Sequence, residues 1–348
     1  MSMLKAEPTA SPAAATRELT FGQAIKEALA EEMRRDPRVF IIGEDVAEAG
    51  TVFRVLAGLV DEFGRERVID SPISEAGITG LGVGAAMTGM RPVVDIMFGD
   101  FMTLAMDQIV NQAAKVHYMS GGKLRVPLVI RTTMGATRRS AAQHSQSLYA
   151  WVAHIPGLKV AIPSTPYDAK GLLKTAIRDD NPVVFFEDKM MYQLKGPVPE
   201  ADYTIPFGVA DVKRSGSDLT IIATSSMVHV ALAAAKMLDE AGISAEVVDP
   251  RTLFPLDARA LVESVSKTGR AIVVDEGYRR YGVTAEIAST VADGAFDYLD
   301  APVMRVTALD VPVPFSPVLE DQTVPTAEAV TAAAKRLCGR GAAAAPAG

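Results

Sequence analysis

The first predicted element is an amphipathic helix near the start of the chain. Apolar residues recur there every four positions, which places them on one helical face, namely Phe21, Ile25, Leu29 and Met33. Thr20 and Gln23 form a capping-box pattern in front of this run, and Asp36-Pro37 follows it. We therefore predict a helix that begins after Thr20 and ends at Asp36-Pro37.

Short runs that are apolar on both faces follow in the first half of the chain. They predict buried strands at residues 38–43, 67–70, 92–97, 127–132, 158–163 and 182–187. Helical segments are predicted between them, one ending near Phe63-Gly64 and others around 75–89 and 100–118. Strands without a polar face that alternate with helices indicate a parallel sheet covered on both sides.

The sequence changes character between residues 188 and 217. This region holds three prolines and three glycines, namely Pro197, Pro199, Pro206, Gly196, Gly208 and Gly216. Such a composition predicts a linker with local structure at most.

The alternation of strands and helices then resumes. Strands are predicted at 218–225, 244–250, 270–277 and 302–308, and helices at 227–241, 257–268, 282–293 and 326–337. We therefore predict the α/β fold class, with two parallel-sheet three-layer domains. The expected division is a flexible tail at 1–16, a first domain at 17–190, a linker at 191–217, a second domain at 218–338 and a flexible tail at 339–348.

The composition fits a folded chain with large buried surfaces. Of 348 residues, 49% are hydrophobic and 22% are charged, and the net charge is −7. A negative charge disfavours nucleic acid or an anionic membrane surface as the main partner. The most apolar region, 77–106, is interrupted by Arg91, Asp95 and Asp100, so we expect no membrane-spanning helix. One cysteine and the lack of a signal-peptide pattern predict a cytoplasmic protein.

Glu75 is the first candidate for chemistry. It follows the strand at 67–70 and precedes a helix, which is the usual place of a ligand crevice in an open α/β sheet. One interpretation is that Glu75 only stabilises the first turn of its helix. The other is that apolar, glycine-rich surroundings hold its carboxylate ready to exchange a proton with a ligand. The residues alone leave both interpretations open.

The glycines of the same helix also fit a dinucleotide-binding pattern. Gly80, Gly82 and Ala85 satisfy G-x-G-x-x-A, and Asp95 and Asp100 follow about 15–20 residues later. The nearest strand, however, ends about ten residues before Gly80, whereas this turn should follow its strand directly. A Gly/Ala helix that lets another helix approach closely is the simpler interpretation.

A polar loop at 135–147 holds the second candidate, His144. The loop separates two predicted strands and contains Arg138, Arg139 and several hydroxyl groups. His144 has polar neighbours and no apolar stripe around it, which favours a role in proton transfer over packing. Motifs for a phosphate-binding loop, a catalytic zinc ion or an activated serine are absent from the sequence. This chain alone therefore suits a phosphate-bearing cofactor poorly.

Several long runs carry a resemblance to a known family. Among them are IIGEDVAEAG (41–50), IDSPISEAGITGLGVGAAMTGMRPV (69–93), AAQHSQS (141–147), DAKGLLKTAIRDDNPVVFFE (168–187) and VPVPFSPVLED (311–321). With these runs the chain resembles the β subunit of thiamine-diphosphate-dependent 2-oxo acid dehydrogenases, the decarboxylase component of the pyruvate/acetoin type. The resemblance spans nearly all of residues 18–337. It implies a transketolase-like pyrimidine-binding domain followed by a transketolase C-terminal domain.

The resemblance also implies a shared cofactor. In this family the α subunit holds the diphosphate of thiamine diphosphate and its Mg²⁺, while the β subunit receives the aminopyrimidine ring. The resemblance therefore implies an α₂β₂ enzyme that cleaves pyruvate or acetoin, in which the β subunit is active only together with the α subunit. The acyl unit passes to the lipoyl group of an acyltransferase core.

The choice of substrate stays open at this point. The loop after Arg131 and the Ser147-Leu148 pair differ from many relatives, and such loop residues shape the substrate pocket. A branched-chain 2-oxo acid dehydrogenase β subunit and a non-catalytic interaction subunit are the alternatives.

Three candidate residues match functional positions of this family. Glu75 matches the glutamate that hydrogen-bonds the pyrimidine nitrogen and exchanges a proton with it. Phe101 matches an aromatic residue that packs against the pyrimidine. His144 matches the histidine near the substrate and the incoming lipoyl group, where it transfers a proton or hydrogen-bonds the transition state.

A potassium site is the last feature that the resemblance implies. Its ligands are main-chain oxygens of Leu128, Ala176 and Ile177, together with Asp179 and Asn181. Oxygen ligands suit a hard cation. A helix C-terminus followed by an Asp-Asn-Pro turn explains the same residues without a metal, so both interpretations are open.

Overall fold

The strands of the first half of the chain pair into one sheet in the computed structural model, which describes residues 16–339. The strand order is β12-β6-β7-β5-β4-β2-β3. The bounds are β2 (Val39–Gly43), β3 (Val68–Asp70), β4 (Arg91–Ile96), β5 (Val129–Met134), β6 (Lys159–Ala161), β7 (Val183–Asp188) and β12 (Thr252–Phe254). Every residue of β2, β5 and β7 is buried, as expected for strands that are covered on both faces.

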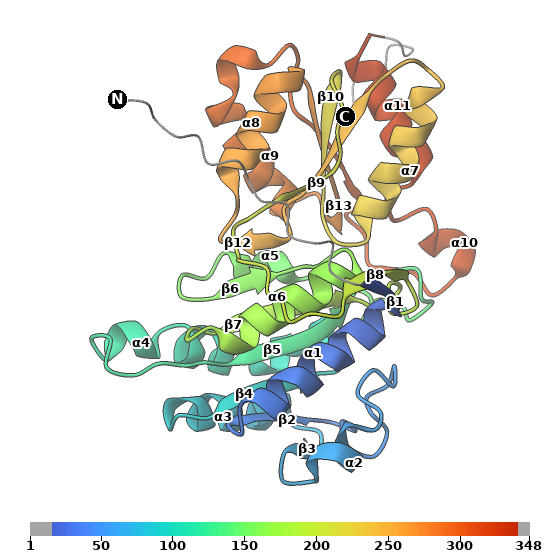
Figure 1. Cartoon of the computed structure of the whole chain (residues 1–348). Coiled ribbons are helices and arrows are strands. Elements are labelled where there is room, and N and C mark those ends of the chain that lie inside the picture. Colours follow the sequence, from blue (N-terminus) through green and yellow to red (C-terminus); the bar gives the residue numbers. More distant parts are fainter. Residues whose placement is uncertain (1–15, 340–348) are drawn as a thin grey trace, which may run out of the picture.

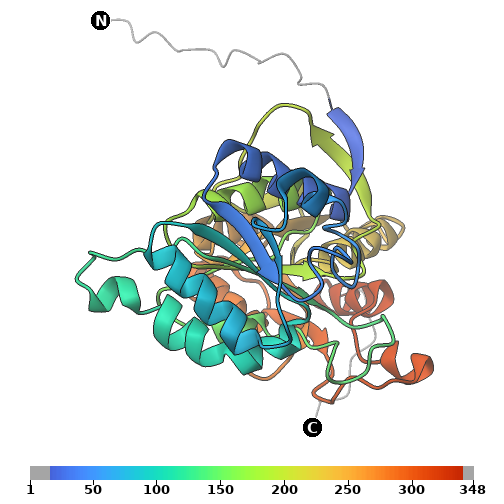
Figure 2. The same ribbon diagram turned by 90° about the horizontal axis from the view of Figure 1, so that it is seen from below.

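Helices cover the two faces of this first sheet, with the blue α1 on one face and the teal helical segments on the other (Figure 2). One face carries α1 (Phe21–Arg35) and α6 (Pro166–Arg178). The other carries α3 (Glu75–Met87), the 3₁₀ helix η1 (Gly99–Ala105), the π-helix η2 (Gln108–Ala113) and α5 (Tyr149–Ala153). The short helices α2 (Leu59–Phe63) and α4 (Val116–Met119) complete this half.

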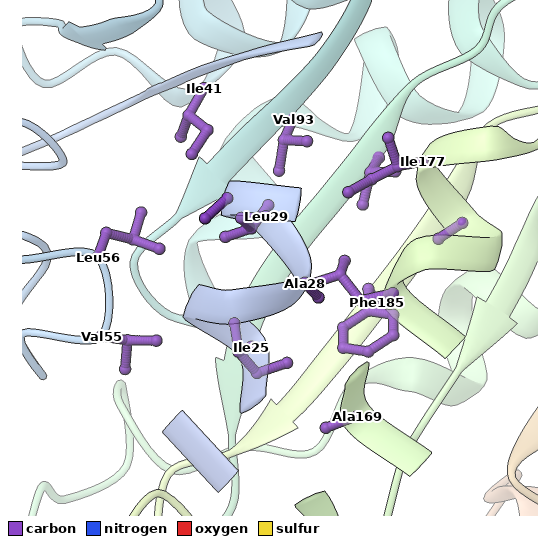
Figure 3. Close-up of a cluster of buried hydrophobic side chains, with 14 of the residues drawn as sticks. Ile25, Ala28, Leu29, Ile41, Val55, Leu56, Val93, Ala169, Ile177 and Phe185 are labelled. Carbon is purple, nitrogen blue, oxygen red and sulfur yellow. The ribbon is translucent and has the colours of Figure 1, made fainter. Parts of the chain in front are cut away.

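Helix α1 forms as the sequence predicts. Thr20 Oγ1 accepts a hydrogen bond from the Gln23 amide at 3.1 Å, and Gln23 Oε1 accepts one from the Thr20 amide at 2.8 Å. The helix packs its apolar face, including Ile25 and Leu29, into the same buried cluster as Phe185 of β7 (Figure 3). Burial of this face against α6 and the sheet is the main source of its stability.

The second half of the chain forms a second sheet above the first (Figure 1). Its strand order is β14-β13-β10-β11-β9, with β9 (Asp211–Arg214), β10 (Leu219–Ala223), β11 (Ala245–Asp249), β13 (Ala271–Tyr278) and β14 (Met304–Ala308). One face packs against α7 (Met227–Asp239) and α11 (Ala327–Leu337), the other against α8 (Ala258–Thr268) and α9 (Val283–Gly294). The short helices η3 (Phe296–Tyr298) and α10 (Pro317–Glu320) follow α9 and β14, respectively. The predicted α/β class with two three-layer units is confirmed.

Each sheet departs from the predicted parallel arrangement at one edge. Strand β12 pairs antiparallel with β6, and β9 pairs antiparallel with β11. Because β12 belongs to the second half of the chain but joins the first sheet, the two units share a strand at their boundary. The segment predicted as linker contains β9 and also β8 (Lys195–Pro199), which pairs with β1 (Thr16–Thr20). Pro197 and Pro199 fit β8 because this strand is paired with β1 alone.

Two further expectations concern helical order. The helix predicted around 100–118 is wrong as one continuous element, because η1, η2 and α4 occupy this stretch as three short pieces. None of the helices at 16–339 has the length and apolar character that a membrane span requires. The predicted tails lie outside the described residues, except Thr16 at the start of β1 and Gly339 after α11.

Candidate active site

Glu75 is the first residue of α3, directly after the loop that follows β3. Ser74 caps the helix, because its hydroxyl accepts a hydrogen bond from the Gly77 amide at 3.3 Å. Glu75 is therefore not needed as the cap, and the residue is only 6% exposed. A carboxylate that is buried at a helix N-terminus, where the helix dipole favours negative charge, is suited to ligand binding.

Glu44 is a second acid beside Glu75, and sequence reasoning missed it. It follows β2, the strand next to β3, so the carboxyl ends of two neighbouring strands bring the two acids together. Burial raises the pKa of the Glu44 carboxyl, and the charges of Glu75 and Asp45 raise it further. Glu44 Oε1 is buried and has no hydrogen-bond partner within the described part of the chain. An unpaired buried acceptor next to Glu75 is suited to a ligand that carries N–H groups.

His144 and Phe101 meet in an aromatic cluster with Phe98. The ring centroids of Phe101 and His144 lie 5.2 Å apart, and those of Phe98 and His144 lie 4.7 Å apart, both edge to face. Phe98 was not predicted, although it stands three residues before Phe101, between β4 and η1. Helix α3, which carries Glu75, packs against η1, which carries Phe101. The three predicted residues thus come from adjacent elements of the same end of the sheet.

Lys189 contacts the backbone of His144 and the ring of Phe98. It is 1% exposed, its ammonium group donates a hydrogen bond to the His144 carbonyl oxygen, and it lies 5.7 Å from the centroid of the Phe98 ring. Burial lowers the pKa of Lys189, while the charges of Asp188 and Glu276 oppose that shift. The loop is also tied to η1, because Gln146 Nε2 donates to Asp100 Oδ1 at 2.8 Å.

A buried arginine joins the middle strands of the first sheet. Arg131 is 2% exposed and donates to both oxygens of Glu187 at 2.8 and 2.6 Å, and it also pairs with Asp95. Tyr192 donates to Glu187 at 2.7 Å. Burial raises the pKa of Asp95 although Arg131 lowers it. Burial also lowers the pKa of Arg131. The charges of Asp95 and Glu187 have the larger effect and raise the arginine pKa well above its ordinary value.

Three buried acids meet where the two units touch. Asp188 ends β7, and Asp275 and Glu276 lie in β13. Burial raises the pKa values of all three, and that of Glu276 rises well above its usual range because Asp188 and Asp275 are also close. Tyr149 donates a hydrogen bond to Asp275, and Glu276 Oε1 has no partner in the part of the chain that the structure describes.

Replacing Glu276 by Gln is expected to flatten the pH dependence of stability. The folded protein holds a proton on Glu276 that the unfolded chain releases above the ordinary pKa of 4.5, so unfolding becomes easier as the pH rises towards the folded-state pKa. Glu276→Gln removes this loss, and its melting midpoint at pH 8 should exceed the wild-type value by about 2–4 °C. Thermal unfolding at pH 5 to 8 measures the effect. Glu286→Gln, at an exposed position on α9, is the control. If the melting midpoint changes with pH equally steeply in Glu276→Gln and Glu286→Gln, the prediction is contradicted.

Four of the five predicted potassium ligands, Ala176, Ile177, Asp179 and Asn181, lie at or just after the C-terminus of α6, whereas Leu128 directly precedes β5. Asp179 Oδ1 accepts hydrogen bonds from the Asn181 amide and from its side-chain nitrogen, both at 2.9 Å, and Lys159 pairs with the same carboxylate. Arg91 donates to the Ile177 oxygen at 3.0 Å. Two cationic side chains, Arg91 and Lys159, therefore already contact oxygen atoms of the predicted ligands Ile177 and Asp179. No group of three or more His, Cys, Asp and Glu at 16–339 could hold a metal ion.

The dinucleotide-binding alternative fails on geometry. Gly80, Gly82 and Ala85 lie inside α3 and not in a turn between a strand and a helix. A Cβ at Gly82 would lie 2.5 Å from the Val94 side chain and 3.2 Å from that of Leu128. Gly82 therefore permits close packing of α3 on the sheet, where the sequence had suggested close packing on another helix.

Comparisons with known proteins place this geometry in a family context. The family model described as "Transketolase, pyrimidine binding domain" matches residues 17–195, and "Transketolase, C-terminal domain" matches residues 208–330. A solved structure titled "Split gene transketolase, inactive beta4 tetramer" superposes with a TM-score of 0.74 at 25% identity, covering 92% of this chain and 98% of its own.

Curated relatives match over nearly their whole length. Acetoin:2,6-dichlorophenolindophenol oxidoreductase subunit beta of Bacillus subtilis is 52% identical, covering 93% of this chain and 98% of its own. Pyruvate dehydrogenase E1 component subunit beta-1 of Oryza sativa is 47% identical, covering 94% and 88%. The 2-oxoisovalerate dehydrogenase subunit beta of Bacillus subtilis is 46% identical, covering 92% and 98%.

Proposed function

Because the chain belongs to the family of dehydrogenase β subunits built from transketolase pyrimidine-binding and C-terminal domains, we propose that it is the β subunit of a thiamine-diphosphate-dependent dehydrogenase that acts on pyruvate or acetoin. The observation that carries the proposal is the buried Glu75 at the start of α3, beside the unpaired oxygen of Glu44. Helix α3 also packs against η1, which carries Phe101 of the aromatic cluster.

The residues at this end of the sheet fit the aminopyrimidine half of thiamine diphosphate. When bound, the cofactor forms a nucleophilic carbon on its thiazolium ring and accepts the electrons that carbon–carbon cleavage releases. Glu75 is proposed to hydrogen-bond a pyrimidine nitrogen and to donate and take back its proton. Phe101 is proposed to pack against the pyrimidine, where its apolar ring would help to exclude water. These assignments retain the residues predicted from the sequence.

We assign the remaining half of the cofactor to a second subunit. In this proposal an α subunit holds the diphosphate and its Mg²⁺, as the resemblance to the family implies. The relatives are named as β subunits, so an α partner is implied, and we propose an α₂β₂ enzyme in the cytoplasm. A lipoyl-bearing acyltransferase core is proposed as the acceptor of the acyl unit.

His144 is proposed to act near the substrate. Its ring contacts the rings of Phe98 and Phe101, and its carbonyl oxygen accepts a hydrogen bond from Lys189, so both its side chain and its backbone are held in place. An imidazole can donate or accept a proton near neutral pH. We propose that it serves the substrate and the incoming lipoyl group in this way.

A substrate panel on the chain co-expressed with its α subunit tests the function. We expect turnover of pyruvate or acetoin with 2,6-dichlorophenolindophenol as electron acceptor. Branched-chain 2-oxo acids should be turned over at a rate at least about tenfold lower, because the pocket discriminates between substrates by size. A complex that forms but turns over no substrate would support the non-catalytic alternative. Turnover by the β chain alone would contradict the shared active site.

We also propose that K⁺ binds at the C-terminus of α6. The main-chain oxygens of Leu128, Ala176 and Ile177 with Asp179 and Asn181 offer the oxygen donors that a hard cation prefers. The ion has to compete with Lys159 for the Asp179 carboxylate.

Potassium is expected to stabilise the protein more than sodium does. A ligand at 100 times its dissociation constant adds about 2.7 kcal/mol to the free energy of unfolding, so the melting midpoint should rise by several degrees in KCl over NaCl at equal ionic strength. Asn181→Ala should abolish the difference. Identical melting of the wild type in the two salts would contradict the site.

A further inference from the structure

The loop at 135–147 has an unusual backbone for a segment that carries a proposed active-site histidine. Gly135, Thr137, Arg139 and Ala141 all have positive φ, at 98°, 67°, 61° and 59°. Three of these four residues carry side chains, which make the left-handed region unfavourable. Such a conformation persists only where surrounding groups determine it.

Glu320 supplies this support from the second unit. It ends the short helix α10, which lies beside the loop (Figures 1 and 2). One carboxylate oxygen accepts a hydrogen bond from the Thr137 amide at 2.7 Å. The other accepts from the Arg139 amide at 3.2 Å and from the Arg139 guanidinium at 2.8 Å. Glu320 thus binds the N–H groups of two left-handed residues.

The burial of Glu320 distinguishes this contact from an ordinary surface pair. Its side chain is fully buried, whereas the neighbouring Asp321, which also pairs with Arg139, is 55% exposed in its side chain. A fully buried carboxylate with three donors is a strong and specific contact, while an exposed ion pair contributes little. The two acids therefore offer a test residue and a matched control on the same arginine.

The far end of the loop is held separately. Lys189 donates to the His144 carbonyl oxygen, and Gln146 donates to Asp100 at 2.8 Å. The first unit thus holds the loop at His144 and Gln146, and Glu320 of the second unit holds it near its start, at Thr137 and Arg139. The preceding segment, 137–143, has no other buried acid that accepts its amides in the described chain.

We propose that Glu320 is a positioning residue, through which the second unit fixes the conformation of the loop and thereby the placement of His144. This inference rests on the proposed function of His144. The residues that transfer protons remain Glu75 and His144, and Glu320 acts through the loop backbone alone.

Hydrogen exchange tests the support without any assay of activity. In the full chain, alone and with its α subunit, Glu320→Gln should speed amide exchange of the peptides that cover 137–139 by about tenfold or more, since a local opening then costs less. Asp321→Asn should leave exchange within about twofold of the wild type. Equal exchange in Glu320→Gln and Asp321→Asn would overturn the proposal. Should Glu320→Gln fail to fold, Glu320→Asp, which keeps the charge but shortens the reach, is measured in its place.

Kinetics of the complete enzyme then separate positioning from general stability. Glu320→Gln should lower kcat by about 10–100-fold, because misplacement of a catalytic group by about 1 Å has this effect, while KM and the cofactor proton exchange assigned to Glu75 stay within about threefold. Adding Thr137→Gly should restore much of kcat, because glycine adopts the left-handed conformation without support. An unchanged kcat, or no rescue, would overturn the proposal. If the wild-type enzyme shows no turnover, the proposed function fails, and hydrogen exchange still decides whether Glu320 holds the loop.

Discussion

Glu75→Gln is expected to abolish turnover of the assembled enzyme while leaving its assembly intact. The amide has nearly the same shape as the carboxylate and keeps the hydrogen-bonding reach of the side chain, but it cannot release and regain a proton near neutral pH. Proton transfer by a positioned side chain contributes about 10²–10⁴-fold to a rate, so kcat should fall by at least this amount. Because Ser74 caps α3, the helix should remain formed.

Two measurements separate loss of chemistry from loss of structure in this variant. Exchange of the thiazolium carbon-bound proton, followed by NMR, should slow together with kcat. The elution volume of the complex and its melting midpoint should match those of Glu66→Gln, an exposed glutamate variant that serves as the control. Full activity of Glu75→Gln would refute the assigned role of Glu75, and so would loss of assembly accompanied by normal exchange.

The parts of the fold that depend on local pattern were predictable from the sequence. The capping box at Thr20, the buried strands and the class of both units follow from spacing and composition, and the structure contains them. What failed depends on contacts between distant residues. Strand β12 joins the first sheet although it lies in the second half of the chain, and no local signal indicates which sheet it enters. The stretch at 100–118 has helical composition, but it is broken into the short pieces η1, η2 and α4, and Phe101 of η1 contacts Phe98 and His144.

The candidate site shows the same division. Glu75 and His144 were found because they stand at strand ends among polar or glycine-rich neighbours, and family resemblance added Phe101. Glu44 could have been found, since it also ends a strand and adjacent parallel strands bring their carboxyl ends together. Lys189 and Glu320 gave no such signal. Their function depends on contacts across 45 residues to His144 and 183 residues to Thr137, which a single sequence does not reveal.

Arg131→Met is expected to destabilise the protein by about 3–5 kcal/mol, because it leaves the buried carboxylates of Asp95 and Glu187 without their cation. Methionine fills a similar volume, so packing changes little and the uncompensated charge dominates. The wild-type Asp95 pKa is already raised by burial, and loss of Arg131 removes the group that opposes this shift. Stability of the variant should therefore fall steeply as the pH rises above the unfolded carboxyl range, and should recover in part towards pH 5.

Denaturant unfolding at pH 5 and pH 8 measures this prediction, and two variants define its cause. Arg34→Met removes a partner from the exposed pair with Glu62 and should change stability little. Neutralising both acids in the Arg131→Met background, with Asp95→Asn and Glu187→Gln, should recover most of the loss, because the triple variant no longer buries an unpaired charge. A triple variant that is as unstable as Arg131→Met would show that side-chain packing, and not charge, determines the contribution of Arg131 to the first sheet.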